Sequence, residues 1–184
     1  MAFDFLVPVE DKVLAHCELL PAQSLGRNIH RHTIRDGLPV LAIASVAIIG
    51  VKESRNAYEK KMETLDVSGI RLQLYKLSMG NWNSTIVDMG DIEEGETVED
   101  TYFAVSSSVA GLVRKKIIPI IIGGSHDLTS ANYLAYEKLE QVINLVSVDS
   151  RLDLGDADGD IDSRSYLNKV VQHQPNYLFN FSNI

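Results

Sequence analysis

Three mainly apolar runs constrain the fold of this chain most strongly. They cover residues 46–51, 117–122 and 142–148, and helical patterns lie between them. Strands that are apolar throughout are typical of parallel sheets covered on both faces, because a strand with one solvent face alternates apolar and polar residues. Apolar strands that alternate with helices therefore predict right-handed βαβ units and a three-layer α/β/α fold with a mostly parallel sheet.

The segments around these runs predict further helices, strands and loops. Helical spacing follows Thr97 as far as Lys116, with acidic residues in the first turn, where negative charge is favoured. A second helix is predicted from about Leu128 to Glu140. Pro119 disfavours a central position in the sheet for its strand, because proline has no N–H to donate. Weaker patterns predict a polar helix over 54–65, a helix over 70–77, a strand over 85–88 and a polar loop over 90–95.

Composition indicates one domain over 1–184, with an irregular or partly helical lead-in at 1–40 and parallel βα units over 41–184. A hydrophobic content of 45% in 184 residues is ample for a core. The net charge of −8 and the absence of any large basic cluster argue against a nucleic-acid partner. Cys17 is the only cysteine, which excludes an intrachain disulfide and a zinc site built from thiolates.

The two ends of the sequence lead to expectations about location and assembly. The N-terminus lacks the basic and apolar regions of a signal peptide, and the apolar stretch over 38–51 is shorter than the ~20 residues that span a bilayer. We therefore expect a cytoplasmic protein with no membrane partner. Residues 176–184 are strand-like with no polar tail, from which we expect the N-terminal part of a longer protein. An incomplete sheet exposes apolar edges and tends to associate, which would favour a homo-oligomer.

Residues that could carry chemistry follow two of the apolar runs. The Gly123–Gly124 pair allows a tight turn that brings His126 over the edge of the sheet, and Asp149 follows the next run. Ligands bind just beyond the carboxyl ends of strands in such sheets. If the segment after residue 148 stays extended, Asp149, Arg151 and Asp153 project to one side. One histidine and two carboxylates there suit Mn²⁺, Zn²⁺ or Mg²⁺.

Together the two segments resemble the ureohydrolase family of arginase, agmatinase and formimidoylglutamase, and formimidoylglutamase-like proteins in particular. The family pattern is Gly-Gly-x-His, then Asp-Ala-His-x-Asp and later Ser-x-Asp-x-Asp; this chain has GGSHD at 123–127 and DSRLD at 149–153. The resemblance implies an arginase-like fold with two Mn²⁺ ions, whose shared hydroxide attacks a small amidine or guanidino substrate. It also implies that His126, Asp149 and Asp153 are metal ligands.

Two departures from the family pattern argue against catalysis. Arg151 stands where the family has its second ligand histidine, and a guanidinium has no lone pair for a metal. No Ser-x-Asp-x-Asp motif occurs before Ile184. We hypothesise that Arg151 lies between Asp149 and Asp153 and replaces the missing metal charge. The alternative is that Arg151 turns to solvent and one weakly held metal binds His126 with the two carboxylates.

Two functional hypotheses follow from these features. In the first, the chain is the N-terminal part of a metal-dependent amidine hydrolase and is inactive in its 184-residue form. In the second, it is a non-catalytic family member with a structural or ligand-binding role. No catalytic residue is assigned, and the substrate cannot be deduced. The remaining acidic residues, Asp156, Asp158, Asp160 and Asp162, are expected to form a solvated loop.

Overall fold

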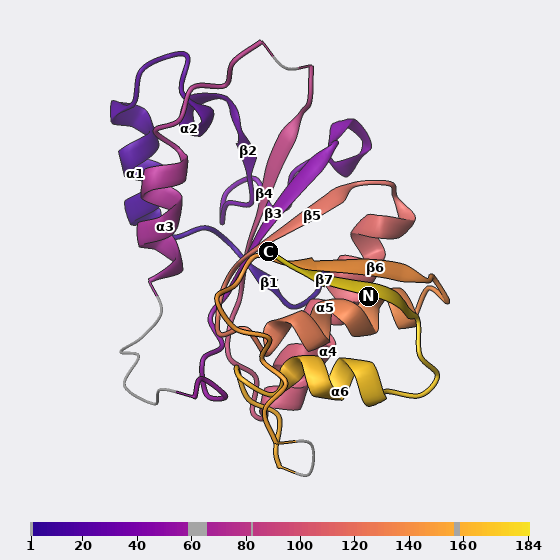
Figure 1. The fold of residues 1–184 in the computed structure, drawn as a ribbon. Coiled ribbons are helices and arrows are strands. Elements are labelled where there is room, and N and C mark those ends of the chain that lie inside the picture. Colours follow the sequence, from indigo (N-terminus) through magenta and orange to yellow (C-terminus); the bar gives the residue numbers. More distant parts are fainter. Residues whose placement is uncertain (1, 59–65, 82, 157–158) are drawn as a thin grey trace.

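The computed structural model describes residues 2–58, 66–81, 83–156 and 159–184. Its main sheet has the strand order β1-β4-β3-β5, and β2 also pairs with β4. Every pairing in this sheet is parallel except that of β1 with β4 (Figure 1). The strands are β1 (Leu6–Val7), β2 (His30–Arg31), β3 (Val46–Val51), β4 (Ile86–Ile92), β5 (Ile118–Gly123), β6 (Ile143–Ser147) and β7 (Leu178–Asn183).

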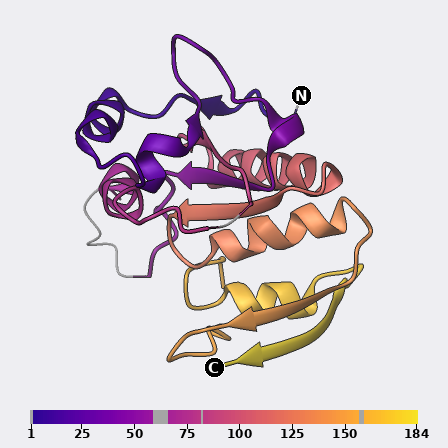
Figure 2. The ribbon, with the colours of Figure 1, turned by 90° about the horizontal axis from the view of Figure 1, so that it is seen from above.

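Helices cover both faces of the main sheet and form two hydrophobic clusters with it. In β3, Ala47, Ile49 and Val51 pack with residues of α4 and α5, whereas Ile48 packs with residues of α1 and α3 on the opposite face. Figures 1 and 2 show these helices on the two sides of the sheet, which confirms the predicted three-layer, mostly parallel α/β/α fold. The helices are α1 (Asp11–Leu19), α2 (Leu25–Asn28), η1 (Leu41–Ile43, a 3₁₀ turn), α3 (Val67–Leu74), α4 (Val98–Arg114), α5 (Leu128–Glu137) and α6 (Tyr166–Gln172).

The central elements lie where the sequence predicts them. The strand over 46–51 is β3, and the helix after Thr97 is α4. Thr97 Oγ1 accepts a hydrogen bond from Asp100 N at 3.1 Å, and the Asp100 carboxylate accepts one from Thr97 N at 2.8 Å. This reciprocal cap fixes the first turn of α4. Among the described residues, none of the helices has the length and apolar character needed to cross a bilayer.

Other predicted elements are shifted or wrong. The helix predicted over 70–77 is α3, which begins earlier because Asp66 Oδ1 accepts a hydrogen bond from Gly69 N at 2.9 Å. The predicted polar helix over 54–65 is not helical in its described part, residues 54–58, and residues 59–65 lie outside the described residues. The polar loop predicted over 90–95 is also partly wrong, because β4 continues to Ile92.

Buried charges explain why β4 extends through a polar stretch. Asp88 and Asp91 are fully buried, and both accept hydrogen bonds from Arg71 of α3, which is itself fully buried. Tyr75 Oη donates a further hydrogen bond to Asp88 at 2.6 Å. Buried charges are tolerated only when they are paired and hydrogen-bonded. The partners from α3 therefore allow carboxylates inside a strand that the sequence pattern assigns to a loop.

The outer strands depart from a single continuous sheet. Within the described residues, β6 pairs with β7 in a separate two-stranded parallel sheet, and β5 pairs only with β3. Ile118 N donates to Ser45 O next to β3, so the nitrogen of Pro119 faces the other edge of β5, where it cannot donate. This agrees with the expectation that Pro119 disfavours a central position.

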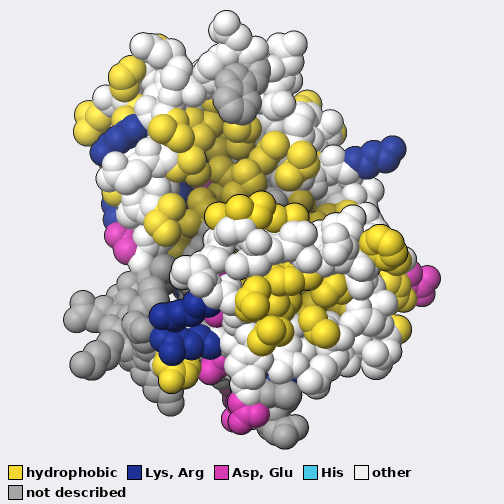
Figure 3. All heavy atoms as spheres, viewed as in Figure 1, with side chains coloured by type: hydrophobic (Ala, Val, Ile, Leu, Met, Phe, Trp, Pro, Cys, Tyr) yellow, Lys and Arg dark blue, Asp and Glu magenta, His cyan; other side chains and the backbone are white. Residues whose placement is uncertain are grey.

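The face of β5 on the α1 and α3 side is only partly covered. Ile118 and Ile120 share this face with Ile48, since Ile120 pairs with Ile48 in register. Their exposed fractions are 63% and 44%, although both are large aliphatic side chains. Figure 3 shows apolar side chains gathered over this part of the molecule. The sheet therefore presents an apolar strand face to its surroundings.

Candidate metal centre

A glycine turn at the end of β5 positions the first candidate ligand. Gly123 and Gly124 have positive φ angles of 126° and 65°, in the region that favours glycine. A Cβ at Gly124 would lie 2.7 Å from Glu53 O, so no larger residue fits against this backbone. The chain then passes through Ser125 and His126 into α5, which places the imidazole beyond the carboxyl end of the strand.

His126 lies between the two predicted carboxylate ligands. Its Nδ1 atom is 3.1 Å from Asp149 Oδ2 and 3.2 Å from Asp153 Oδ2. One nitrogen or oxygen atom from each residue lies within 4.8 Å of the other two. The Asp153 side chain is 4% exposed and that of Asp149 is 16% exposed, whereas that of His126 is 61% exposed. The triad therefore combines two shielded carboxylates with an imidazole that solvent can reach.

The loop after β6 bends, so the assumption of an extended segment is wrong. Arg151 N donates a hydrogen bond to Asp149 Oδ1 at 3.1 Å, and Asp153 has a positive φ of 46°. Arg151 is exposed at this bend. It forms no ion pair with Asp149 or Asp153, and His126 occupies the position between them. The hypothesis that a guanidinium lies between the two carboxylates is therefore also wrong.

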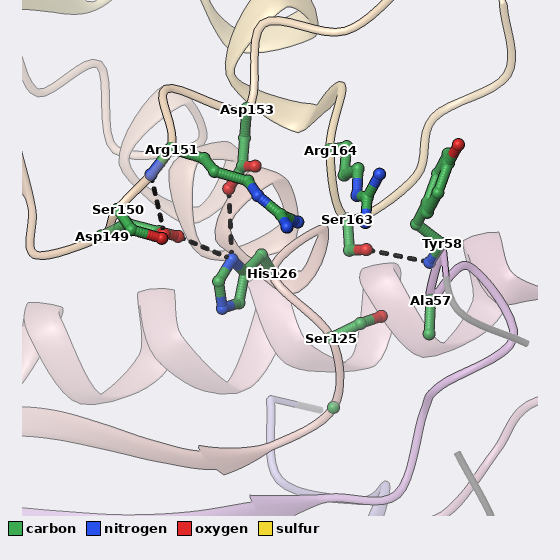
Figure 4. A pocket seen from close by; sticks show the side chains of 11 residues that line it. Ala57, Tyr58, Ser125, His126, Asp149, Ser150, Arg151, Asp153, Ser163 and Arg164 are labelled. Atoms are coloured by element: carbon green, nitrogen blue, oxygen red, sulfur yellow. Dashed lines mark hydrogen bonds and ion pairs between the residues drawn. The ribbon is translucent and has the colours of Figure 1, made fainter. Parts of the chain in front are cut away.

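Arg151 instead lines a cavity of about 380 Å³ beside the triad (Figure 4). The wall opposite comes from two segments that the sequence patterns did not associate with the site: Tyr58 after β3, and Ser163 with Arg164 before α6. Nothing in the local sequence identifies these residues as part of a site, because Ser163 and Arg164 lie in a stretch that the sequence pattern assigns to an acidic loop. Only the packing of that loop against the segment after β3 brings them to the site.

A buried network supports the turn that carries His126. The Asp127 carboxylate is fully buried and accepts hydrogen bonds from Ser125 Oγ and Tyr102 Oη. Asp127 stands at the N-cap of α5, but its side chain makes no capping hydrogen bond and is bonded to these two hydroxyls instead. Burial and the adjacent Asp127 raise the pKa of Tyr102, so the phenol stays a hydrogen-bond donor.

Tyr166 forms one side of the triad. Its ring meets the His126 ring edge-on at 6.3 Å between centroids. Burial raises the pKa of this phenol, and the nearby Asp153 and Asp149 carboxylates raise it further. The neutral Tyr166 hydroxyl therefore lies beside the Asp149 and Asp153 carboxylates.

Comparison with known proteins places this arrangement in a family. The model of the Arginase family matches residues 44–175. The chain belongs to the arginase family. A formimidoylglutamase of Streptococcus gordonii is 31% identical over 117 residues, which cover 59% of this chain and 35% of that protein. The motifs after β5 and β6 lie inside the arginase-family match.

Solved structures of arginase-family proteins share the fold at low sequence identity. Trypanosoma cruzi formiminoglutamase with Mn²⁺ matches with a TM-score of 0.67 and 19% identity, over 86% of this chain and 56% of that one. Arginase from Medicago truncatula matches with a TM-score of 0.62 and 16% identity, over 95% of this chain and 55% of that one. The chain thus spans about half the length of these two relatives and about a third of the curated one.

Proposed function

We propose that this chain binds one divalent cation, with Mn²⁺ as the family's metal, through His126, Asp149 and Asp153. The support is their proximity, since the three donor atoms lie within 4.8 Å of one another. Imidazole nitrogen and carboxylate oxygen form a donor set suited to Mn²⁺. The residues present therefore fit one ion. A bound divalent ion would supply Lewis acidity to a group placed in the adjacent cavity.

We further propose that the chain on its own is not an amidine hydrolase. The family's chemistry uses two metals, and Arg151 supplies a cation where the resemblance expects the second histidine ligand. Within the described residues there is a single cluster of three or more potential ligands. A second ion would therefore have to be held by residues outside this cluster. For the whole protein, a small amidine or guanidino compound is the proposed substrate class, since the curated relative is a formimidoylglutamase.

The alternative is a non-catalytic family member that binds a small ligand beside its metal. The cavity of about 380 Å³ favours this reading, because it places two arginines next to the proposed metal ligands. In such a protein, His126, Asp149 and Asp153 would hold a cation that organises the cavity without turning over a substrate.

Titration with Mn²⁺, followed by the electron paramagnetic resonance of the free ion, tests the proposal. We expect one ion per chain for the wild type and a loss of binding in Asp153→Asn. Asp11→Asn, at an exposed residue of α1, is the matched control and is expected to bind normally. Two ions per chain, or sustained manganese-dependent release of ammonia or formamide from an amidine, would overturn the proposal.

A further inference from the structure

We infer that Arg151 and Arg164 form a binding subsite for the carboxylate or phosphate group of a small anionic ligand, in the cavity beside His126. This inference deepens the proposed ligand-binding role, because it names the chemistry of the ligand. Both arginines line the same cavity of about 380 Å³, together with the three proposed metal ligands. In Figure 4 the Arg151 side chain extends from the triad toward Ser163, and the Arg164 side chain lies beside Tyr58.

The Arg151 guanidinium is available to a ligand. The backbone N–H of this residue bonds to Asp149, but the guanidinium pairs with neither Asp149 nor Asp153, whose Oδ2 atoms face His126. Guanidinium N–H groups form a planar fork that matches the two oxygens of a carboxylate or phosphate. The substitution of histidine by arginine at this family position thus replaces a metal ligand with a donor for oxyanions.

The opposite wall presents a second guanidinium in a fixed plane. The Arg164 guanidinium carbon lies 3.6 Å from the centroid of the Tyr58 ring, a stacked cation–π arrangement. This contact fixes the guanidinium against the Tyr58 ring at the edge of the cavity. Ser163 Oγ accepts a hydrogen bond from Tyr58 N at 2.9 Å, and Ser163 N donates to Asn56 O at 3.0 Å. These bonds tie the loop to the segment after β3 and hold Arg164 in place.

The Ser163 hydroxyl and the charges around the cavity complete the subsite. Ser163 Oγ uses a lone pair to accept its hydrogen bond, so its O–H can still donate to a bound oxygen. The cavity lining contains two arginines and two aspartates, Asp149 and Asp153, which lie at the triad. A divalent cation at the triad would offset these two negative charges and so favour an anion in the cavity. Anion binding and Mn²⁺ binding should therefore strengthen each other by the same factor.

Calorimetric titration with succinate and with inorganic phosphate tests the subsite, and the two probes distinguish a carboxylate from a phosphate ligand. We expect at least one of them to bind, and succinamide, the uncharged analogue of succinate, not to bind. Arg151→Gln and Arg164→Gln should each weaken binding roughly tenfold or more, the loss expected for a charge-assisted hydrogen bond. Arg35→Gln is the matched control, since the Arg35 side chain is 93% exposed and lies outside the cavity lining.

The outcomes separate this inference from the proposed metal site. Arg151→Gln keeps every proposed metal ligand, so its Mn²⁺ binding should not weaken while its anion binding weakens roughly tenfold or more. Selective loss of succinate or phosphate binding supports the subsite even if the wild type binds no Mn²⁺. Equal anion binding by the wild type and Arg151→Gln, equal losses in Arg35→Gln, or no binding of either probe would overturn it. Because Arg151 is exposed, its variant tests the inference even if Arg164→Gln is unstable.

Discussion

Arg71 of α3 and Asp88 of β4 form a fully buried, two-pronged ion pair. Arg71 Nε lies 2.8 Å from Asp88 Oδ2, and Arg71 Nη2 lies 3.1 Å from Asp88 Oδ1. Both side chains are 0% exposed. The pair ties α3 to the middle of the sheet, and it lets β4 carry charge inside the protein.

Asp88→Asn should therefore be strongly destabilising. The change removes the carboxylate that accepts hydrogen bonds from Arg71 and Tyr75, although Arg71 keeps Asp91 as a partner. A hydrogen bond to a charged group contributes about 1.5–3 kcal/mol, so we expect the free energy of unfolding to fall by at least this amount. The control is Glu18→Gln at the surface pair of Glu18 and Arg27, whose side chains are 73% and 38% exposed. Surface pairs contribute about 0–1 kcal/mol. Urea unfolding measures both, and similar losses in the two variants would contradict the role assigned to Asp88.

Glu53 should make stability depend on pH in the acid range. Burial raises the pKa of this carboxyl, but hydrogen bonds from Arg55 and Thr101 outweigh burial and leave it below 4.5. The folded state thus favours the ionised form. The resulting stabilisation is present above pH 4.5 and is lost as the pH falls through the folded-state pKa.

Glu53→Gln removes this contribution, and urea unfolding from pH 7 downward is the measurement. The difference in unfolding free energy between the wild type and Glu53→Gln should be largest near neutral pH and should shrink below pH 4.5. Glu140→Gln, at an exposed position, is the control and should follow the wild type. A difference that does not change with pH would show that Glu53 acts by packing alone.

Arg151→His tests whether position 151 faces the metal. We expect the variant to bind Mn²⁺ roughly tenfold more tightly or better, because the change removes a repelling charge and adds a ligand nitrogen. The repulsion between two unit charges at short range in water alone is worth about 1 kcal/mol. Arg151→Gln removes the charge without adding a good ligand, so its gain should be smaller. Equal affinities of the two variants would mean that residue 151 cannot reach the ion.

Gly124→Ala should disturb the turn that carries His126. Its φ is +65°, and an added Cβ would lie 2.7 Å from Glu53 O and 2.0 Å from Leu128 Cδ1. We expect lower stability and weaker Mn²⁺ binding, measured by thermal unfolding and metal titration. Gly37→Ala is the matched control, since Gly37 has a φ of +70° but nothing within 4 Å of an added Cβ. It should show only the backbone strain, about 1–3 kcal/mol.

The exposed face of β5 should bind apolar probes. We expect the dye ANS to fluoresce with the wild type and much less with the double variant Ile118→Thr, Ile120→Thr, because both side chains lie on the uncovered face. Leu19→Thr is the control, since Leu19 is 83% exposed on α1 rather than on this strand. An unchanged signal in the double variant would place the dye elsewhere.

Local patterns in the sequence were sufficient for the layered fold, and together with the family motifs they selected the three residues that the structure brings together. Apolar runs and helical spacing depend on near neighbours, so β3, α4 and β5 could be located. Glycines after a strand indicate a turn for the same reason, and family motifs supplied the residue types at His126 and Asp149. The buried ion pair of Arg71 and Asp88 could not be predicted, because its partners are 17 residues apart and neither is apolar.

By itself, then, the sequence determined the layered parallel architecture, and it determined that a histidine and two aspartates follow adjacent strands in the chain. Only the tertiary structure decided the direction of Arg151, because that direction depends on the bend of the loop after β6. Tertiary packing also decided that Tyr58 and Arg164 face the same cavity as His126. Contacts between distant segments set such relationships, and no spacing along the chain encodes them.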